Sequence, residues 1–421
     1  MTESNFGTKK QTISIVTLLV TTGLMWFGFF MLIPLLAVHI TDDLGLGAAI
    51  AGFVLAVRQF TQFGLGLFVA ALADWAGYRR MIMLGMLVRA LGFFWLAFAS
   101  DVLTLSLSAA LAAVGGAFFE SSSKAAIVAL SKGYKRETIF SLLTTIGNIG
   151  MSTGPIAGVA LLKVDFSVVG MVAASMYLIN FLLVWIFVPV VASTGNGKGG
   201  VSQMFSNLGV VWNNKPFVLI TVLMVGYYSL YSQINITLPL KAEKLTGNEE
   251  SVGLLYVINS GLAITLQILC MRYLTRWFKP VTVIGVGTLV AGLGLLLVSF
   301  VSSYLLLLVC LVVYALGRLV VEPMSAVLVS NYATEQTMAS YFGFNSLALG
   351  FGGVFGSFLG GWMFDFGPQH GLDNLCWWFF GFLGVLVAVG VVIFQRSEKR
   401  RANLVISTGM ESVVAASPDA D

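Results

Sequence analysis

Long apolar runs recur along this chain, and they constrain its fold more than any other feature. Each extends over roughly 20 residues, the length that an α-helix needs to cross the hydrocarbon core of a bilayer. The runs do not alternate apolar and polar residues as the strands of a membrane β-barrel do. They predict twelve spans, at residues 13–40, 47–72, 80–99, 102–128, 138–162, 167–191, 217–240, 252–274, 280–299, 303–328, 337–364 and 374–395. The predicted class is therefore an all-α membrane protein.

The composition agrees with this class and excludes several kinds of function. Hydrophobic residues make up 58% of the chain and charged residues only 10%, whereas a soluble domain carries about 25% charged residues. The three cysteines are widely spaced and the two histidines are isolated, which is not the spacing of a metal site or a disulfide framework. No nucleophile–base pair or phosphate-binding loop stands out. We therefore expect neither an enzyme nor a metal or other cofactor.

The longest polar connector, Ser193 to Lys215, divides the spans into two sets of six. This predicts an N-terminal bundle at 1–191, a cytoplasmic linker at 192–216, a C-terminal bundle at 217–395 and a cytoplasmic tail at 396–421. The tail beyond Arg401 has no periodic pattern, so we expect it to be unstructured.

The basic residues predict the orientation, because cytoplasmic loops of membrane proteins are enriched in Lys and Arg. With both termini inside, sixteen of the 23 basic residues fall on the cytoplasmic side, three fall outside and four lie within spans. The sequence thus predicts a multi-pass protein of the cytoplasmic (inner) membrane with both termini inside. The net charge of +4 reflects this anchoring pattern, and we expect no nucleic-acid partner.

The two halves repeat at an offset of 202 residues. Glu120 then coincides with Glu322 and Gly115 with Gly317. The same offset aligns Gly150, Gly154 and Gly158 with Gly352, Gly356 and Gly360. Transporters use such repeats to build two bundles around one central site.

A glycine-rich stretch in the fifth predicted span, GNIGMSTGPIAG, places Gly150, Gly154 and Gly158 on one helix face. A face of small residues lets helices approach closely, and Pro155 removes a backbone hydrogen bond and bends the helix. The pattern GxxxGPxxG resembles motif C of the drug:proton antiporters of the major facilitator superfamily. The resemblance implies that this helix is a surface on which the bundles rock.

The loop after the second span, ALADWAGYRR, resembles motif A of the same superfamily. Asp74, Gly77, Arg79 and Arg80 match that motif, and the resemblance implies that they lock a cytoplasmic gate. The second-half counterpart, RYLTRWFKP, has no Asp, so the lock should be lopsided. The sequence also departs from motif B, because Leu111 stands where the family places an arginine that is tied to proton coupling.

Two pairs of opposite charges lie within spans, where an ionisable residue is a functional candidate by default. Glu120 and Lys124 are four residues apart in span four, and Arg318 and Glu322 are four apart, in the opposite order, in span ten. The resemblance places both spans around a central cavity. We predict proton coupling at Glu322 and Glu120. The alternative is that the pairs are structural and close the cytoplasmic gate, the role expected for Lys124.

Polar and aromatic residues in other spans suit an amphipathic organic ligand. The predicted substrate-binding residues are Trp26, Arg58, Gln59, Gln62, Tyr227, Tyr231, Gln233, Asn235, Asn259 and Arg318. Arg89, in the third span, is expected to be structural.

The wider resemblance is to MdtH-type multidrug resistance proteins and covers roughly residues 15 to 400. It rests on stretches such as LAVRQF, MLVRALGF, FFESSSKAAIV and FGGVFGSFLGGWMFD. It implies twelve transmembrane helices in two six-helix bundles and proton-coupled export of lipophilic or amphipathic compounds by a monomer. The alternative is a transporter of one anionic metabolite, lipid or siderophore. Four basic and two acidic residues within the spans favour an anion.

Overall fold

The computed structural model describes residues 2–65, 76–130, 136–189, 209–333 and 338–415, and within these ranges it contains helices but no strand. The first half holds α1 (Thr2–Val38), the π-helix η1 (His39–Asp43), α2 (Ala48–Gly64), α4 (Tyr78–Leu96), α5 (Val102–Leu130), α6 (Arg136–Leu162) and α7 (Phe166–Phe187). The second half holds α9 (Lys215–Tyr231), the short η2 (Ser232–Asn235), α10 (Thr237–Thr246), α11 (Ser251–Trp277), α12 (Pro280–Leu297), η3 (Val298–Phe300), α13 (Tyr304–Tyr332), α14 (Met338–Gln369) and α15 (Leu375–Ala415).

Nine helical segments of the described residues are long and apolar enough to cross a membrane. They fall in α1, α5, α6, α7, α9 with α10, α12, α13, α14 and α15. The helices α2, α4 and α11 are not among them. One reason is that α4 carries three arginines, and another is that residues 66–75, which follow α2, lie outside the described ranges. The membrane class is confirmed, and the full number of twelve spans stays a prediction.

Most helices begin and end within a few residues of the predicted spans, with three corrections. The first helix begins at Thr2, well before the predicted residue 13. The seventh span was predicted as one helix, but η2 interrupts it at Ser232–Asn235. The tail beyond Arg401 was predicted to be unstructured, and this is wrong as far as Ala415, because α15 continues to that residue. No proline interrupts α15, so nothing in its backbone forces the helix to stop at the charged residues that follow the span.

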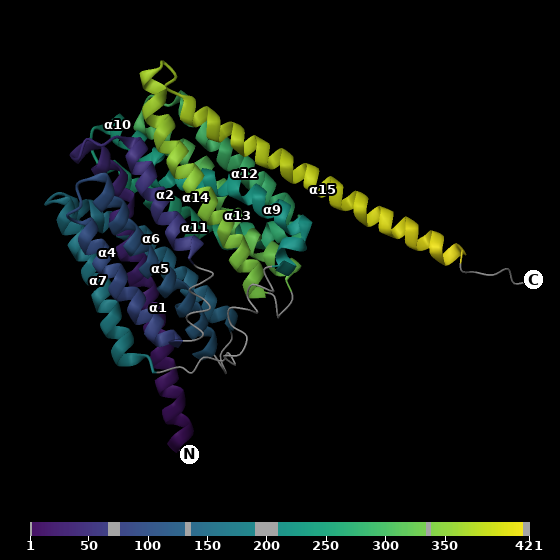
Figure 1. Ribbon diagram of the computed structural model, residues 1–421, viewed down its shortest axis with the longest axis horizontal. Coiled ribbons are helices and arrows are strands. Elements are labelled where there is room, and N and C mark those ends of the chain that lie inside the picture. Colours follow the sequence, from purple (N-terminus) through teal and green to yellow (C-terminus); the bar gives the residue numbers. More distant parts are fainter. Residues whose placement is uncertain (1, 66–75, 131–135, 190–208, 334–337, 416–421) are drawn as a thin grey trace, which may run out of the picture.

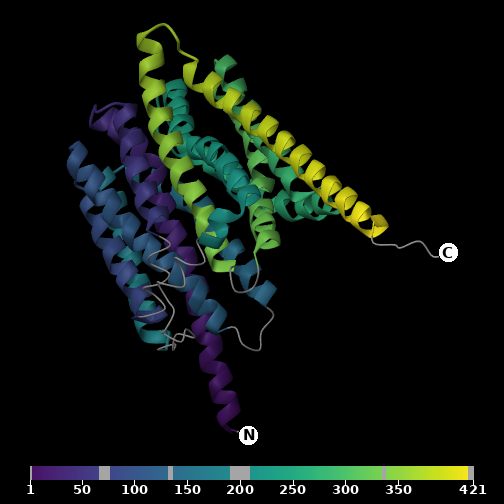
Figure 2. The ribbon, with the colours of Figure 1, turned by 45° about the vertical axis from the view of Figure 1, so that its right-hand side comes forward.

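The helices form two bundles, one from each half of the chain (Figures 1 and 2). The N-terminal bundle packs α1 against α6 and α7, and α4 against α5 and α7, while the C-terminal bundle packs α12 against α13 and α15. The outer side of the C-terminal bundle is apolar; Leu305 of α13, for example, is 72% exposed. In a membrane-spanning chain such side chains face lipid, and the helices satisfy their own backbone hydrogen bonds as hydrocarbon requires.

The predicted close packing of the glycine face on α6 is confirmed. A Cβ at Gly150, Gly154 or Gly158 would lie 2.4, 2.6 or 2.1 Å from a backbone oxygen of α1. The repeat holds in space as well. Gly352, Gly356 and Gly360 of α14 meet α9 in the same way, since a Cβ at each would lie within 2.6 Å of an atom of α9 or η2. Both glycine faces therefore pack inside a bundle.

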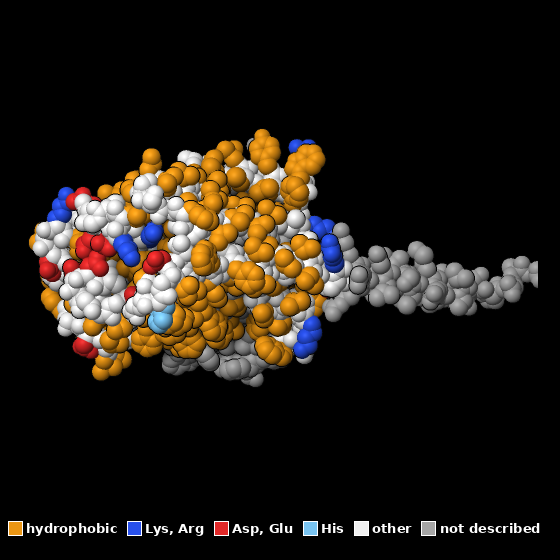
Figure 3. Space-filling view, turned by 90° about the horizontal axis from the view of Figure 1, so that it is seen from above, with side chains coloured by type: hydrophobic (Ala, Val, Ile, Leu, Met, Phe, Trp, Pro, Cys, Tyr) orange, Lys and Arg blue, Asp and Glu red, His pale blue; other side chains and the backbone are white. Residues whose placement is uncertain are grey.

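The two bundles also meet each other at one end of the molecule, where α2 and α11 begin and α14 ends. We call this the closed end, and we call the opposite end, where α1 begins, the terminal end. At the closed end, Lys163 Nζ lies 2.8 Å from Glu250 Oε1, and the backbone N–H of Ala49 donates to Asp365 Oδ2 at 2.7 Å. Figure 3 looks onto the closed end and shows acidic and basic side chains gathered over its loops.

Candidate functional site

A polar cavity lies between the bundles, and it consists of two adjoining recesses of about 330 and 120 Å³. Asn148 and Met151 of α6 and Glu322 of α13 line both recesses. The larger recess is also lined by Thr22, Met25, Trp26, Phe119, Glu120, Ser123, Leu143 and Gly147. The smaller one is also lined by Tyr231, Asn259, Ala263, Gln267, Ala315, Arg318, Leu319 and Pro323.

The two span carboxylates reach this cavity from opposite bundles. Glu120 projects from α5 and Glu322 from α13, and both line the larger recess. The 202-residue repeat explains this placement, because it puts the same residue at the same depth of two equivalent helices. Glu120 and Glu322 thus face one cavity, and their role in proton coupling stays a prediction.

The guanidinium of Arg318 is held in place on the wall of the smaller recess. Its Nη1 donates to Asn259 Oδ1 at 3.1 Å, and its Nη2 lies 3.9 Å from Glu322 Oε1. The same guanidinium lies 4.2 Å from the ring centroid of Tyr231, a cation–π distance. The side chain of Arg318 is only 11% exposed, whereas that of Glu322 is 49% exposed. Arg318 is therefore fixed, and Glu322 presents its carboxylate to the cavity.

A second buried arginine is connected to Glu120 through one amide. Arg58 Nη1 donates to Gln62 Oε1 at 3.2 Å, and Gln62 Nε2 lies 3.5 Å from Glu120 Oε2. Arg58 and Arg89 also approach the ring of Phe29, each with its guanidinium carbon 5.0 Å from the centroid. Arg58 and Gln62 thus lie behind the cavity wall and act on Glu120 through hydrogen bonds.

The structure brings together some of the predicted substrate-binding residues and separates others. Trp26, Tyr231, Asn259 and Arg318 line the cavity. Gln59 instead lies between the bundles, where its Nε2 is 3.5 Å from Ser357 Oγ. Three further residues are buried inside the C-terminal bundle and line neither recess, namely Tyr227, Gln233 and Asn235.

Gln233 and Asn235 have hydrogen-bond partners that explain their burial, whereas the buried hydroxyl of Tyr227 has none among the described residues. Gln233 Nε2 donates to the carbonyls of Ser229 and Gly356, at 2.7 and 2.9 Å. Asn235 Oδ1 accepts a hydrogen bond from the hydroxyl of Tyr256 at 2.9 Å. These contacts hold the break at η2, because they bind its side chains to α9, α11 and α14.

The cavity also contains residues that the sequence did not single out, above all Asn148 and Met151. Both stand in the glycine-rich stretch of α6, which was interpreted as a packing and rocking surface and not as part of the cavity wall. A polar Asn beside Gly147, within an otherwise small and apolar face, was the signal that could have identified a lining residue. Met25 and Gln267 gave no such signal, since each looks like an ordinary span residue.

The motif A residues are only partly visible. Asp74 lies outside the described residues, as does the side chain of Lys124. Gly77 precedes α4 with φ of +88°, a conformation that favours glycine. Arg79 Nη2 donates to the carbonyl of Trp185 at 2.5 Å, a contact within the N-terminal bundle. Arg80 is exposed. A gating role for Asp74, Gly77, Arg79, Arg80 and Lys124 therefore stays a prediction.

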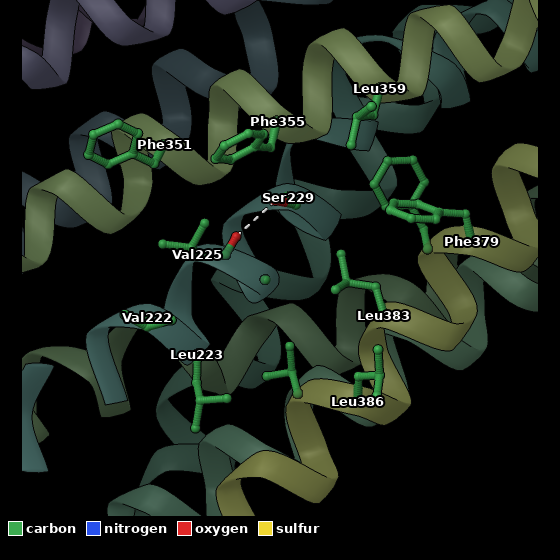
Figure 4. A pocket seen from close by; sticks show the side chains of 13 residues that line it. Val222, Leu223, Val225, Ser229, Phe351, Phe355, Leu359, Phe379, Leu383 and Leu386 are labelled. Carbon is green, nitrogen blue, oxygen red and sulfur yellow. Dashed lines mark hydrogen bonds between the residues drawn. The ribbon is translucent and has the colours of Figure 1, made fainter. Parts of the chain in front are cut away.

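A separate groove of about 550 Å³ lies on the outer side of the C-terminal bundle, between α9, α14 and α15 (Figure 4). Its lining is apolar except for Ser229, whose hydroxyl donates to the carbonyl of Val225 at 2.9 Å. Val222, Phe355 and Leu386, at its rim, are about half exposed. Because the groove offers no free polar group, it has none of the chemistry of the central cavity.

The central cavity combines two carboxylates and a fixed guanidinium with aromatic and methionine side chains. Such a site can hold an amphipathic organic molecule, and its carboxylates can bind protons or a cationic group. Across the described part of the chain, no group of three or more His, Cys, Asp or Glu residues could hold a metal ion.

Comparison with known proteins agrees with this architecture. The family model of the Major Facilitator Superfamily matches residues 18–243 and 226–414. Multidrug resistance protein MdtH of Enterobacter sp. (strain 638) is 32% identical over 393 residues, which cover 93% of this chain and 96% of that protein. Multidrug resistance protein MdtH of Yersinia enterocolitica is 30% identical over 391 residues, which cover 93% and 96%.

Solved structures share the fold at low sequence identity. The nucleoside transporter NupG has a TM-score of 0.75 and 14% identity, covering 90% of this chain and 98% of that one. A POT family transporter in complex with 5-aminolevulinic acid has a TM-score of 0.77 and 14% identity, covering 91% and 96%. The predicted family resemblance is thereby confirmed. The chain belongs to the Major Facilitator Superfamily and is a multi-pass membrane transporter rather than an enzyme.

Proposed function

We propose that this transporter exports lipophilic or amphipathic compounds in exchange for protons, by alternating access of the central cavity. The observation that carries the proposal is the placement of Glu120 and Glu322 on one cavity wall each, in opposite bundles. The curated relatives, which match over nearly their whole length, are multidrug resistance proteins. The aromatic and methionine side chains of Trp26, Tyr231 and Met151 suit an apolar ligand with some polar character.

The described state is, in this proposal, the one that is open to the cytoplasm. Twelve spans with both termini inside place the terminal end on the cytoplasmic side and the closed end outside. The bundles touch at the closed end through Asp365 and Lys163. The cavity lies on the other side of these contacts, so the substrate enters it from the cytoplasm or from the inner leaflet. One monomer contains the whole path.

Like charges give a physical reason for exchange. Closing the cavity at the terminal end brings α5 and α13 together and, with them, Glu120 and Glu322. Two ionised carboxylates repel each other at short range in a low-dielectric site. The empty, doubly ionised cavity is therefore slow to close, and it closes when a proton or a cationic substrate neutralises one carboxylate. When the cavity then opens to the outside, it releases the substrate and takes up a proton.

Arg318 and Gln62 give the two carboxylates different surroundings. Glu322 lies 3.9 Å from the guanidinium of Arg318, and Glu120 lies 3.5 Å from the amide of Gln62. Glu322 thus has a cation as its neighbour, whereas Glu120 has a neutral amide. The two carboxylates therefore differ in their affinity for a proton or a cation, and the exchange needs both of them.

The test is proton release from purified protein in weakly buffered detergent solution when a lipophilic substrate is added. Wild-type protein should release protons, and Glu322→Gln should not, while it still binds substrate. Ser330→Ala, a change at a partly exposed α13 position outside the cavity, is the matched control and should behave as wild type. Release that persists undiminished in both Glu322→Gln and Glu120→Gln would refute the assignment of these residues.

A second candidate is transport of one anionic metabolite, lipid or siderophore, and one observation favours it. Arg318 lines the cavity, and Arg58 lies behind it with a buried Nε that has no hydrogen-bond partner. A screen that compares organic acids with cationic dyes separates the two functions. Counterflow of organic acids that is lost in Arg318→Gln, with no response to cationic dyes, would favour the anion carrier.

A further inference from the structure

The helix α2 begins without a cap of its own, and the missing cap comes from the other bundle. The first four N–H groups of a helix lack intrahelical partners, and a Ser, Thr, Asn or Asp at the N-cap normally binds one of them. The N-cap of α2 is Gly47, which has no side chain to do this. Asp365, 316 residues further along the chain, accepts the N–H of Ala49 at 2.7 Å instead.

Asp365 stands at the end of a continuous seam between α2 and α14. The residues of α14 on this seam recur every fourth position, at Gly353, Ser357, Gly361 and Asp365. A Cβ at Gly361 would lie 2.1 Å from the carbonyl oxygen of Ala48, and a Cβ at Gly52 would lie 2.3 Å from that of Ser357. The backbones are thus in contact, and Asp365 reaches Ala49 only while this seam is closed.

The repeat supplies an internal comparison, because the offset of 202 residues aligns Asp365 with Lys163. Lys163 lies at the equivalent end of α6 and pairs with Glu250, the N-cap of α11, at 2.8 Å. That pair is 65% and 48% exposed, so water screens it and it contributes little. Asp365 is only partly exposed, and its carboxylate also lies against the positive end of the helix dipole. The two seams therefore close with unequal strength.

We propose that Asp365 is a positioning residue of the transport cycle, which caps α2 only in the state that is shut at the closed end and so sets the equilibrium between the two states. The substrate and the coupling ion do not enter this argument. Because both bundles keep their internal packing when they separate, opening of the closed end breaks the cap and leaves the N–H of Ala49 to water.

The expected size follows from measured helix caps. Loss of a cap and its charge corresponds to about five- to thirty-fold in an equilibrium constant. Asp365→Ala should raise the ratio of open to shut closed ends by this factor. Asp365→Asn keeps an oxygen acceptor and loses the charge, so its shift should be smaller and of the same sign.

The experiment measures the separation of the bundles at the closed end. Spin labels are placed at Ser100→Cys and Ser302→Cys, exposed positions that the 202-residue offset relates, after Cys270, Cys310 and Cys376 are replaced. Electron–electron distance distributions are then recorded in nanodiscs without substrate. Asp165 gives a matched control, since it caps α7 through Ser167 N–H at 2.7 Å within one bundle. Asp165→Ala should leave the distances unchanged.

The outcomes separate cleanly. A larger long-distance fraction in Asp365→Ala and Asp365→Asn, but not in Asp165→Ala, supports the proposal. Unchanged distances in a folded, monodisperse Asp365→Ala protein overturn it, as does an equal shift in Asp165→Ala. If Asp365→Ala does not fold, Asp365→Asn carries the same test. Because no substrate or proton gradient is used, the result is independent of the proposed export function.

Discussion

A single methyl group on the seam between α2 and α14 should change which end of the transporter is open. In Gly361→Ala the new Cβ would lie 2.1 Å from the carbonyl oxygen of Ala48, whereas an ordinary contact between such atoms is at least about 3.3 Å. The two backbones must therefore separate by about 1 Å in the shut state. Overpacking of this kind costs about 1–3 kcal/mol, which corresponds to about 5- to 150-fold in an equilibrium constant.

The chain contains a matched substitution with the same clash. A Cβ at Gly158 of α6 would also lie 2.1 Å from a carbonyl oxygen, that of Met31, but this contact lies inside the N-terminal bundle. Gly158→Ala should destabilise both states equally. We expect it to lower the free energy of unfolding by about 1–3 kcal/mol and to leave the conformational equilibrium unchanged.

Two measurements distinguish the outcomes. Distance distributions between labels at Ser100→Cys and Ser302→Cys report the equilibrium, and thermal unfolding in detergent reports stability. Gly361→Ala should lengthen the label distance, and Gly158→Ala should lower the unfolding temperature alone. The reasoning fails if Gly361→Ala lowers stability without changing the distances, because the seam would then persist in both states.

Three further predictions follow from the site and the closed end. Arg318→Lys keeps the charge, but a lysine cannot contact the amide and carboxylate partners of Arg318 in the same geometry. Proton-driven transport of the substrate should therefore fall by about tenfold, measured as kcat/KM in proteoliposomes. The pKa of Glu249 is raised to about 7 by burial and by neighbouring carboxylates. The folded state then binds more protons than the unfolded state below that pH, so the unfolding free energy should decrease as pH rises from about 5 to 7 and level off above. Glu249→Gln should flatten this profile, and a slope that stays unchanged would contradict the assignment. Gly261→Ala in α11 meets no atom within 4 Å, so it should raise helix stability by about 0.5–1 kcal/mol, seen as a higher unfolding temperature, and a lower temperature would disprove the inferred space.

The fold was largely predictable because few backbone structures can cross the hydrocarbon core of a membrane. An apolar run of the right length must be a helix, so α5, predicted at 102–128, was found at Val102–Leu130. The break at Ser232–Asn235 was not predictable from hydropathy, because Gln233 and Asn235 look like isolated polar residues in a span. Their partners at Gly356 and Tyr256 belong to other helices, and no local pattern reports such contacts.

The site was predictable where the repeat helped and not elsewhere. Glu120 and Glu322 could be placed on one cavity because equivalent helices put them at equal depth. Gln59 was assigned to substrate, but it faces Ser357 across the seam, since one helix such as α2 presents different faces to the cavity and to the other bundle. The cap at Ala49 could not be predicted from the sequence, because Ala49 and Asp365 are 316 residues apart.

The seam between α2 and α14 limits how tightly this protein can seal itself. Every turnover must break the cap from Asp365 and the backbone contacts around Gly361 and then form them again. A cap stronger by about 1.4 kcal/mol would slow opening tenfold if the open state were otherwise unchanged. A weaker one would leave both ends open more often and let ions leak through the membrane. The modest strength of a single helix cap thus sets a compromise between leakage and turnover rate.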